Sequence, residues 1–151
     1  MNKDRTKKKN HKVALIWIIS IALILMFIFN NTKKDKIVRL VIKNQDFLNE
    51  CIKNKTYDKI YEISAIKSIT PYSLSNNEFY IDFYCSGFGI APSSTYYGFY
   101  YSSNDEPIGF QAAQMELEPD DNGWMWQQPN GDNSYYTEKI SKNWYYYKAG
   151  F

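Results

Sequence analysis

The residues that most often perform acid–base or nucleophilic chemistry are scarce in this chain of 151 residues. The only histidine, His11, lies in a lysine-rich N-terminal stretch, so the rest of the chain lacks the usual general base for neutral pH. Neither Cys51 nor Cys85 has a histidine partner, and two cysteines without a histidine do not make a structural zinc site. We therefore expect no metal ion and no cofactor, and the composition argues against an enzyme.

The acidic residues include two adjacent pairs, Asp105-Glu106 and Asp120-Asp121. Glycosidase chemistry needs two carboxyl groups that converge across a cleft, whereas neighbouring side chains diverge in an extended or turn segment. Acidic residues in turns ordinarily hydrogen-bond their own backbone. A small carboxylate-dependent hydrolase is therefore the least favoured of the functions considered for this chain.

Two further motifs are weak. The segment Ser86-Gly87-Phe88-Gly89 has glycine-x-glycine spacing, but no lysine follows it, so it is not a phosphate-binding loop. Further along the chain, four residues with side-chain oxygens could bind calcium, but their spacing matches no EF-hand loop. Those residues are Glu118, Asp120, Asn122 and Asp132.

The two cysteines allow two interpretations. On an extracytoplasmic domain, Cys51 and Cys85 could form a disulfide, which persists in oxidising compartments. Closing a loop of this length stabilises a fold by about 3–4 kcal/mol on the chain-entropy account. Alternatively, both thiols are buried as small hydrophobic side chains.

Aromatic residues are the strongest remaining signal, because residues 56–151 contain fourteen tyrosines, three tryptophans and six phenylalanines. One face of a sheet cannot bury them all. Tyrosine is common in strands, and it is also enriched at binding surfaces. The second interpretation predicts an exposed binding face on the outward side of two strands, formed by Tyr80, Asp82, Tyr84, Tyr96 and Tyr100.

An uninterrupted apolar run from Val13 to Phe29 is expected to anchor the chain in a membrane. As a helix it would extend about 26 Å, close to the thickness of a hydrocarbon core. Six basic residues precede it and five follow within residues 33–43, so the positive-inside rule places the N-terminus in the cytoplasm. A cleaved signal peptide is the alternative, but cleavage at the only small-x-small triplet near the run, residues 20–22, would leave an apolar N-terminus.

The charge beyond residue 55 excludes one class of partner. Residues 56–151 carry five basic and twelve acidic side chains, and no lysine or arginine occurs between Ile69 and Thr137. Nucleic-acid binding depends on neutralising phosphates with basic side chains. We therefore expect no nucleic acid among the partners.

The hydrophobic periodicity changes once along the chain. Residues 36–54 follow helical spacing around one apolar stripe, either as a second helix that starts near Thr32 or as the continuation of one long helix. From residue 57 onward, alternation of apolar and polar residues predicts strands, for example over residues 78–85, 96–101 and 108–118. Residues 134–142 are predicted as a short helix and residues 144–148 as a closing strand.

Together these patterns predict an α+β chain with four parts. They are a basic cytoplasmic tail (1–12), a transmembrane anchor (13–30), a juxtamembrane amphipathic helix (31–55) and an extracytoplasmic domain (56–151). The last part is predicted as an antiparallel β-meander of about five to six strands.

Several motifs carry a resemblance to a known family. They are FYCSGFG (83–89), STYYGFYYS (94–102), Trp124-x-Trp126, GDNSYYTEKI (131–140) and NWYYY (143–147). These motifs resemble those of a family of small exported or membrane-anchored proteins of low-GC Gram-positive bacteria, which has no established activity. The resemblance implies an intact exported domain, and it supplies no catalytic residue.

The sequence therefore predicts a single-pass protein of the cell membrane whose tyrosine-rich domain is non-catalytic and binds another protein outside the cytoplasm. An accessory, sensor or immunity-type role fits this interpretation. The alternative is a glycan-binding module in which exposed aromatic rings stack on sugars.

Overall fold

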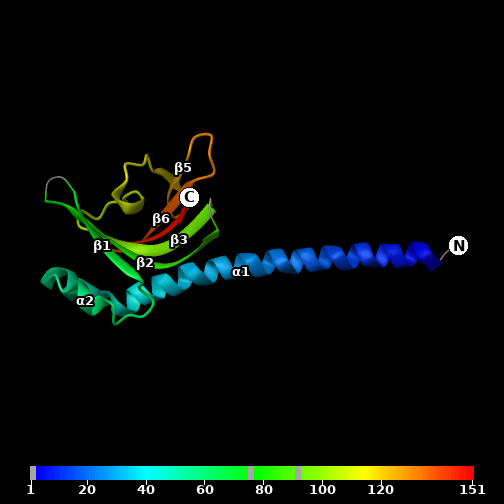
Figure 1. Ribbon diagram of the computed structural model, residues 1–151, viewed down its shortest axis with the longest axis horizontal. Coiled ribbons are helices and arrows are strands. Elements are labelled where there is room, and N and C mark those ends of the chain that lie inside the picture. The colour runs from blue at the N-terminus through cyan, green and yellow to red at the C-terminus, as the bar shows by residue number, and fades with distance from the viewer. Residues whose placement is uncertain (1–2, 75–76, 91–92) are drawn as a thin grey trace. The chain divides into compact units, whose positions relative to one another are not determined.

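The computed structural model describes residues 3–74, 77–90 and 93–151. Before Lys33, it describes the side chains of Trp17, Ile19, Ser20, Ile21 and Leu25 only, and it leaves out that of Ile90. The chain divides into two compact units, residues Met1–Asp35 and Lys36–Phe151. Helix α1, Lys3–Asn54, contributes to both (Figure 1).

In the first unit, α1 runs without a break through the apolar run and past Thr32, so the interpretation with a fresh helix start at that residue is wrong. Within the part of the chain whose placement is described, no helix combines the length and apolar character needed to cross a membrane. Most side chains of residues 13–29 lie outside that part. The membrane anchor therefore stays a prediction.

The second unit is built on one antiparallel sheet of seven strands, in the order β1-β2-β3-β7-β6-β5-β4. The α+β class is confirmed, with more strands than the predicted five to six. The strands are β1 Ser68–Ser73, β2 Phe79–Ile90, β3 Ser93–Ser102, β4 Glu118–Asp120, β5 Gly123–Gln127, β6 Ser134–Ser141 and β7 Trp144–Gly150. The short helices are α2, Tyr57–Ile60, and the 3₁₀ turn η1, Phe110–Ala112.

The sheet is not one continuous meander but two, β1-β2-β3 and β4-β5-β6-β7, which meet where β3 pairs with β7. Residues 103–117 connect β3 to β4 and are called the crossover segment below (Figure 1). Because β4 lies at the far edge of the sheet, this segment has to pass over β7, β6 and β5. It therefore covers one face of the sheet.

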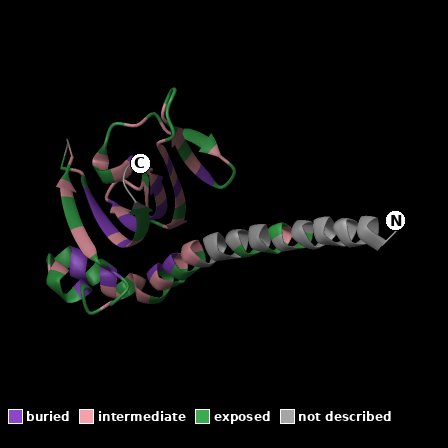
Figure 2. Ribbon diagram, turned by 45° about the vertical axis from the view of Figure 1, so that its right-hand side comes forward, coloured by how far each residue is buried: buried purple, intermediate pink, exposed green. Residues whose placement is uncertain are grey.

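The other face is covered by the second-unit part of α1 and by α2, as the amphipathic stripe over residues 36–54 predicts. Figure 2 shows the buried residues along α1 beyond Lys36 and along the strands. Two hydrogen bonds tie α1 to the sheet, from Trp144 Nε1 to Asn49 Oδ1 at 3.1 Å and from Ser141 Oγ to Gln45 Oε1 at 2.9 Å. The buried members of this helix-face core are Ile37, Val41, Leu48, Cys51, Ile52, Ile60, Ile66, Ile81, Phe83, Cys85, Tyr97, Phe99, Trp144 and Tyr146.

The prediction of a helix over residues 134–142 is wrong, because this stretch forms β6. Tyr136 and Ile140 suggested one turn of helix, but a spacing of four also equals two periods of a strand. Both side chains pack against the helix-face core, whereas Tyr135 and Thr137 are buried on the opposite face. Pairing with β5 and β7 on both sides decides in favour of the strand.

Residues 108–112 were also predicted as part of a strand, and they instead lie in the crossover segment around η1. Their apolar alternation reflects burial against the sheet rather than pairing within it. Ile108, Phe110 and Ala112 all pack against the buried residues of the crossover-covered face.

Candidate functional site

The structure places all five residues of the predicted binding face on the same side of the sheet, but it covers most of them. Tyr80 and Tyr100 are 0% exposed and Asp82 is 4% exposed, whereas Tyr84 and Tyr96 are half-buried. The expectation of an open tyrosine surface is therefore wrong. The physical reason is the crossover segment, whose apolar residues pack on this face together with the neighbouring strands.

The buried tyrosine hydroxyls hold the crossover segment in place. The Tyr100 hydroxyl accepts from the Ile108 backbone N–H at 3.1 Å and lies 2.8 Å from Thr137 Oγ1. The Tyr135 hydroxyl donates to the Ile108 carbonyl at 2.9 Å. Both polar groups of one loop residue are thus satisfied by the face that they cover, which is what makes burial of an irregular segment tolerable.

A second set of contacts fixes the start of the crossover segment at Asp105. Its carboxylate accepts from Lys139 Nζ and from the Asn143 backbone N–H, each at 2.7 Å. Its carbonyl accepts from the Tyr145 hydroxyl at 2.6 Å. The hydrogen bond from Lys139 is the main reason that the pKa of Asp105 is lowered.

Asp82 lies deeper and lacks a cationic partner among the described side chains. It accepts hydrogen bonds from Tyr80 at 3.2 Å and from Tyr147 at 3.5 Å. Burial raises its pKa to about 6, because removing water penalises the charged form more than these two hydrogen bonds favour it. A Cβ on Gly98 would lie 2.6 Å from the Tyr147 hydroxyl, so a glycine is needed there to let that ring reach Asp82.

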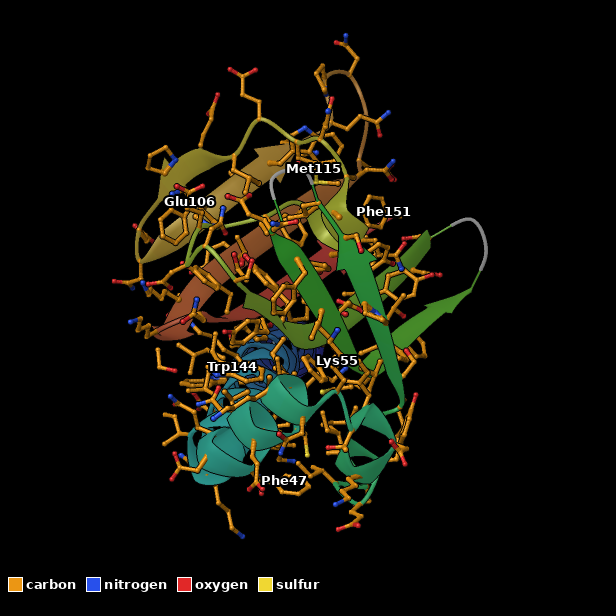
Figure 3. The ribbon with its side chains drawn as sticks, turned by 90° about the vertical axis from the view of Figure 1, so that its left-hand side faces the viewer. Phe47, Lys55, Glu106, Met115, Trp144 and Phe151 are labelled. Atoms are coloured by element: carbon orange, nitrogen blue, oxygen red, sulfur yellow. The ribbon has the colours of Figure 1, made fainter. Side chains whose placement is uncertain are left out.

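At the end of this face where Tyr84 and Tyr96 remain half-exposed, the structure contains a cavity of about 480 Å³. We call it the aromatic pocket. Figure 3 shows Met115 and Phe151 on this side of the sheet, away from Phe47 of α1. The aromatic pocket is lined by Tyr96, Phe110, Gln111, Ala113, Met115 and Phe151.

Aromatic rings lead from β2 into this pocket as a continuous row. Ring centroids lie 6.1 Å apart for Tyr84 and Tyr96, 5.8 Å for Tyr96 and Phe110, and 5.2 Å for Phe110 and Phe151. Tyr147 of β7 packs edge-on against Phe110, with their ring centroids 5.4 Å apart. The pocket therefore has an apolar floor that rests on the buried tyrosine cluster.

The wall of the pocket includes strained backbone. Gln111 has φ 53° and ψ 37°, and Ala112 has φ 61°. Two consecutive non-glycine residues in the left-handed region are unusual, since each is disfavoured by its Cβ. Such strain concentrates at ligand-binding and switch regions, and here it occurs beside the only face of the described sheet that a loop covers.

Other candidate sites are less developed. A cleft of about 580 Å³ lies between the end of α1 and the β1–β2 hairpin, and one of about 200 Å³ lies beside β5. Glu78 and Glu106 converge on the side-chain amide of Asn104, which donates to them at 3.4 and 3.1 Å. Glu78 lines the larger of these two clefts, and Glu116 and Glu118 both line the smaller one. Across the described residues, no three histidine, cysteine or acidic side chains come together as a metal site.

Cys51 and Cys85 are both buried in the helix-face core, and both are free thiols. The structure thus follows the interpretation in which they pack as small hydrophobic side chains. Burial raises the pKa of Cys85 to about 12, so its thiol stays protonated and is a poor nucleophile.

Comparisons with known proteins found no match among family models, curated proteins or solved structures. The resemblance to small exported proteins of Gram-positive bacteria therefore stays a prediction.

Three lining residues escaped the sequence-based prediction, namely Phe110, Met115 and Phe151. The alternation over residues 108–117 signalled that these side chains are buried on one side. The alternation could not show that this segment passes over the sheet and does not pair within it. The path of the segment depends on the pairing of β3 with β7, which puts β4 at the far edge of the sheet.

Proposed function

We propose that this protein is a non-catalytic, membrane-anchored binding protein that receives an apolar side chain of a protein partner in the aromatic pocket. The observation that carries the proposal is the pocket itself, an open and mainly apolar depression with strained backbone in its wall. Pockets of this size and character are the usual sites of ligand recognition.

The partner's side chain would contact rings on three sides. Tyr96, Phe110 and Phe151 supply the aromatic surface, and Met115 supplies a flexible side chain that adapts to different shapes. Buried aromatic anchors of this kind contribute most of the affinity at protein interfaces. The side-chain amide of Gln111 is the main polar group available to orient the partner.

A sugar ring fits this pocket less well. Glycan binding by stacking favours rings that lie in one plane along a groove, whereas the Tyr96 and Phe110 rings are inclined by 35° and the Phe110 and Phe151 rings by 32°. Catalysis by a carboxylate pair is the less favoured alternative. Glu78 and Glu106 both accept from the Asn104 amide. Glu116 and Glu118 line the small cavity beside β5, but both are exposed there.

The location of the protein follows from the sequence. The run from Val13 to Phe29 would anchor the chain, and the basic residues before it would keep the N-terminus in the cytoplasm. The second unit begins at Lys36, about six residues beyond that run. The pocket would therefore meet its partner outside the cytoplasm.

Site-specific photo-crosslinking in cells tests the proposal on the full chain. p-Benzoylphenylalanine replaces Met115 in the pocket. In a matched control it replaces Met125 of β5, which is 41% exposed and lines the separate small cavity beside that strand. We expect one discrete protein adduct from position 115 that is absent from position 125. Excess untagged wild-type chain should compete it away.

Two results would contradict the proposal. Identical adducts from both positions would mean that the pocket has no selectivity. Retention of the full chain on purified cell-wall glycan, with no protein adduct at position 115, would favour the glycan-binding alternative.

A further inference from the structure

One edge of the sheet near the aromatic pocket is left open. Strand β2 runs from Phe79 to Ile90, but β1 pairs with it only from Phe79 to Tyr84. On its other side β2 continues to pair with β3 as far as Ile90. Within the described chain, residues 86–90 of β2 therefore have a strand on one side only, and we call them the free edge.

The free edge differs from the two outer strands of the sheet. β1 carries Pro71 and β4 carries Pro119, and a proline removes the backbone donor that an added strand would need. The free edge has no proline and no charged residue. Edges are normally protected by such residues, so this stretch is the part of the described sheet that is most open to another strand.

Side chains on both sides of the free edge are suited to an apolar partner. Phe88 is 76% exposed and lies opposite Thr95, on the face that α1 covers elsewhere. On the other face, a Cβ on Gly87 would lie 2.7 Å from the Tyr84 hydroxyl, so the Tyr84 side chain lies over Gly87. Tyr84 is the first ring of the row that leads to the aromatic pocket.

Lys67 marks the end of the free edge. Its backbone N–H donates to the Tyr84 carbonyl at 2.8 Å, at the last point where the β1 segment contacts β2. A strand added antiparallel to β2 would run in the same direction as β1 and would finish beside Lys67. An acidic residue or carboxyl terminus at the end of that strand would then complement the lysine.

We infer that the partner binds by strand addition: an extended segment of about five residues, apolar on both faces and acidic at its C-terminal end, pairs with residues 86–90. Main-chain hydrogen bonds then supply affinity, and the alternating side chains, one set against Phe88 and the other against the Tyr84 row, supply specificity. This inference rests on the proposed function, because it names how the partner of the aromatic pocket approaches.

The test uses two synthetic peptides and the full chain in lipid nanodiscs. The first probe is fluorescein-labelled Gly-Thr-Val-Ile-Val-Glu, and the second is the same peptide N-methylated at alternate residues, so that it cannot pair along one edge. Fluorescence anisotropy should show binding of the first peptide, weaker by about tenfold or more after methylation. Amide hydrogen exchange of residues 86–90 should slow when the first peptide binds.

Variants locate the contact. Phe88→Ala should weaken binding of the first peptide several-fold. Lys67→Gln should weaken it for the acid-ended peptide but not for a glutamine-ended version whose C-terminus is amidated. Phe79→Ala is the matched control, since Phe79 lies on the same strand where β1 already pairs, and it should leave the affinity unchanged.

The failures are distinguishable. Equal binding of both peptides, or loss of binding in Met115→Glu but not in Phe88→Ala, would overturn strand addition and leave the proposed pocket function standing. No binding of either peptide at about 1 mM would also overturn strand addition. If the crosslink at position 115 is absent as well, both proposals fail.

Discussion

The helix-covered face of the sheet buries mainly aliphatic side chains and rings that stack on one another, such as Phe83 on Phe99 at 4.7 Å. The crossover-covered face instead buries five tyrosines and a carboxylate, whose polar atoms bond to each other and to a loop. Both faces exclude water, and on the second the tyrosine hydroxyls bond directly to the segment that covers them. The difference shows that a sheet face rich in tyrosine can be buried. The tyrosine hydroxyls supply the hydrogen bonds that an irregular covering segment needs.

This contrast also explains where the pocket lies. A helix satisfies its own backbone and can cover a face with side chains alone, whereas the crossover segment depends on specific hydrogen bonds at Asp105 and Ile108. Beyond the last of these bonds the segment is held mainly by ring contacts, and there the aromatic pocket opens.

The largest effect should come from the helix-covered face. Trp144→Ala removes a fully buried indole that contacts Phe83, Phe99 and Tyr101. It also leaves Asn49 without its hydrogen bond. We expect the free energy of unfolding to fall by about 3–5 kcal/mol, measured by chemical denaturation. A loss below about 1 kcal/mol would mean that α1 is not the main cover of this face.

Asp82→Asn should have the next largest effect, with the opposite sign. The pKa of Asp82 is raised by burial to about 6 from 3.8, so its contribution to stability is fully present below about pH 4 and is lost as the pH rises through about 6. The asparagine variant avoids this loss and should be more stable than wild type by about 2–3 kcal/mol near neutral pH. Near pH 4 the two proteins should unfold alike. A variant less stable at both pH values would show that Asp82 is not a buried, unpaired acid.

A smaller effect compares one tyrosine from each face. Tyr100→Phe leaves the Ile108 N–H without its acceptor and should cost about 1–2 kcal/mol. Tyr146→Phe, on the helix-covered face, removes a hydroxyl that forms no hydrogen bond to the described residues, and it should change the stability by less than about 0.5 kcal/mol. Thermal unfolding of the two variants checks the contrast, and equal losses would remove the chemical distinction between the faces.

The smallest effect concerns the strained wall of the pocket. Gln111→Gly relieves a positive φ and should stabilise the protein by about 0.5–1 kcal/mol. The same change should weaken the crosslink at position 115, because the pocket loses both its preset shape and the Gln111 amide. Unchanged crosslinking together with higher stability would mean that the strain serves no binding role.

Much of the architecture follows from the sequence. The stripe over residues 36–54 predicts a helix that covers the sheet, and the alternation in β2 and β3 assigns Tyr80, Asp82 and Tyr100 to one common face. Both predictions depend on local periodicity, which is written in neighbouring residues. The periodicity also assigned a shared face to Tyr84 and Tyr96, and the structure places both at the pocket end of that face.

What the sequence could not supply is the covering of that face. Alternation separates two faces, but it does not say whether the second one meets solvent or a loop. Here the decision rests on the pairing of β3 with β7, which are separated by the whole crossover segment and three strands. The aromatic pocket depends on the same long-range pairing, so Phe110, Met115 and Phe151 had no local signal as a site.

The central position of β7 has a consequence for the timing of folding. The two meanders join only through β3 and β7, so the sheet cannot become continuous until residues 144–150 have been synthesised. Contacts between segments distant in the chain form slowly. Until then, β1, β2 and β3 have to wait with one side of β3 unpaired. Folding should therefore depend on how well that side of β3 is protected from other strands while the rest of the chain is made.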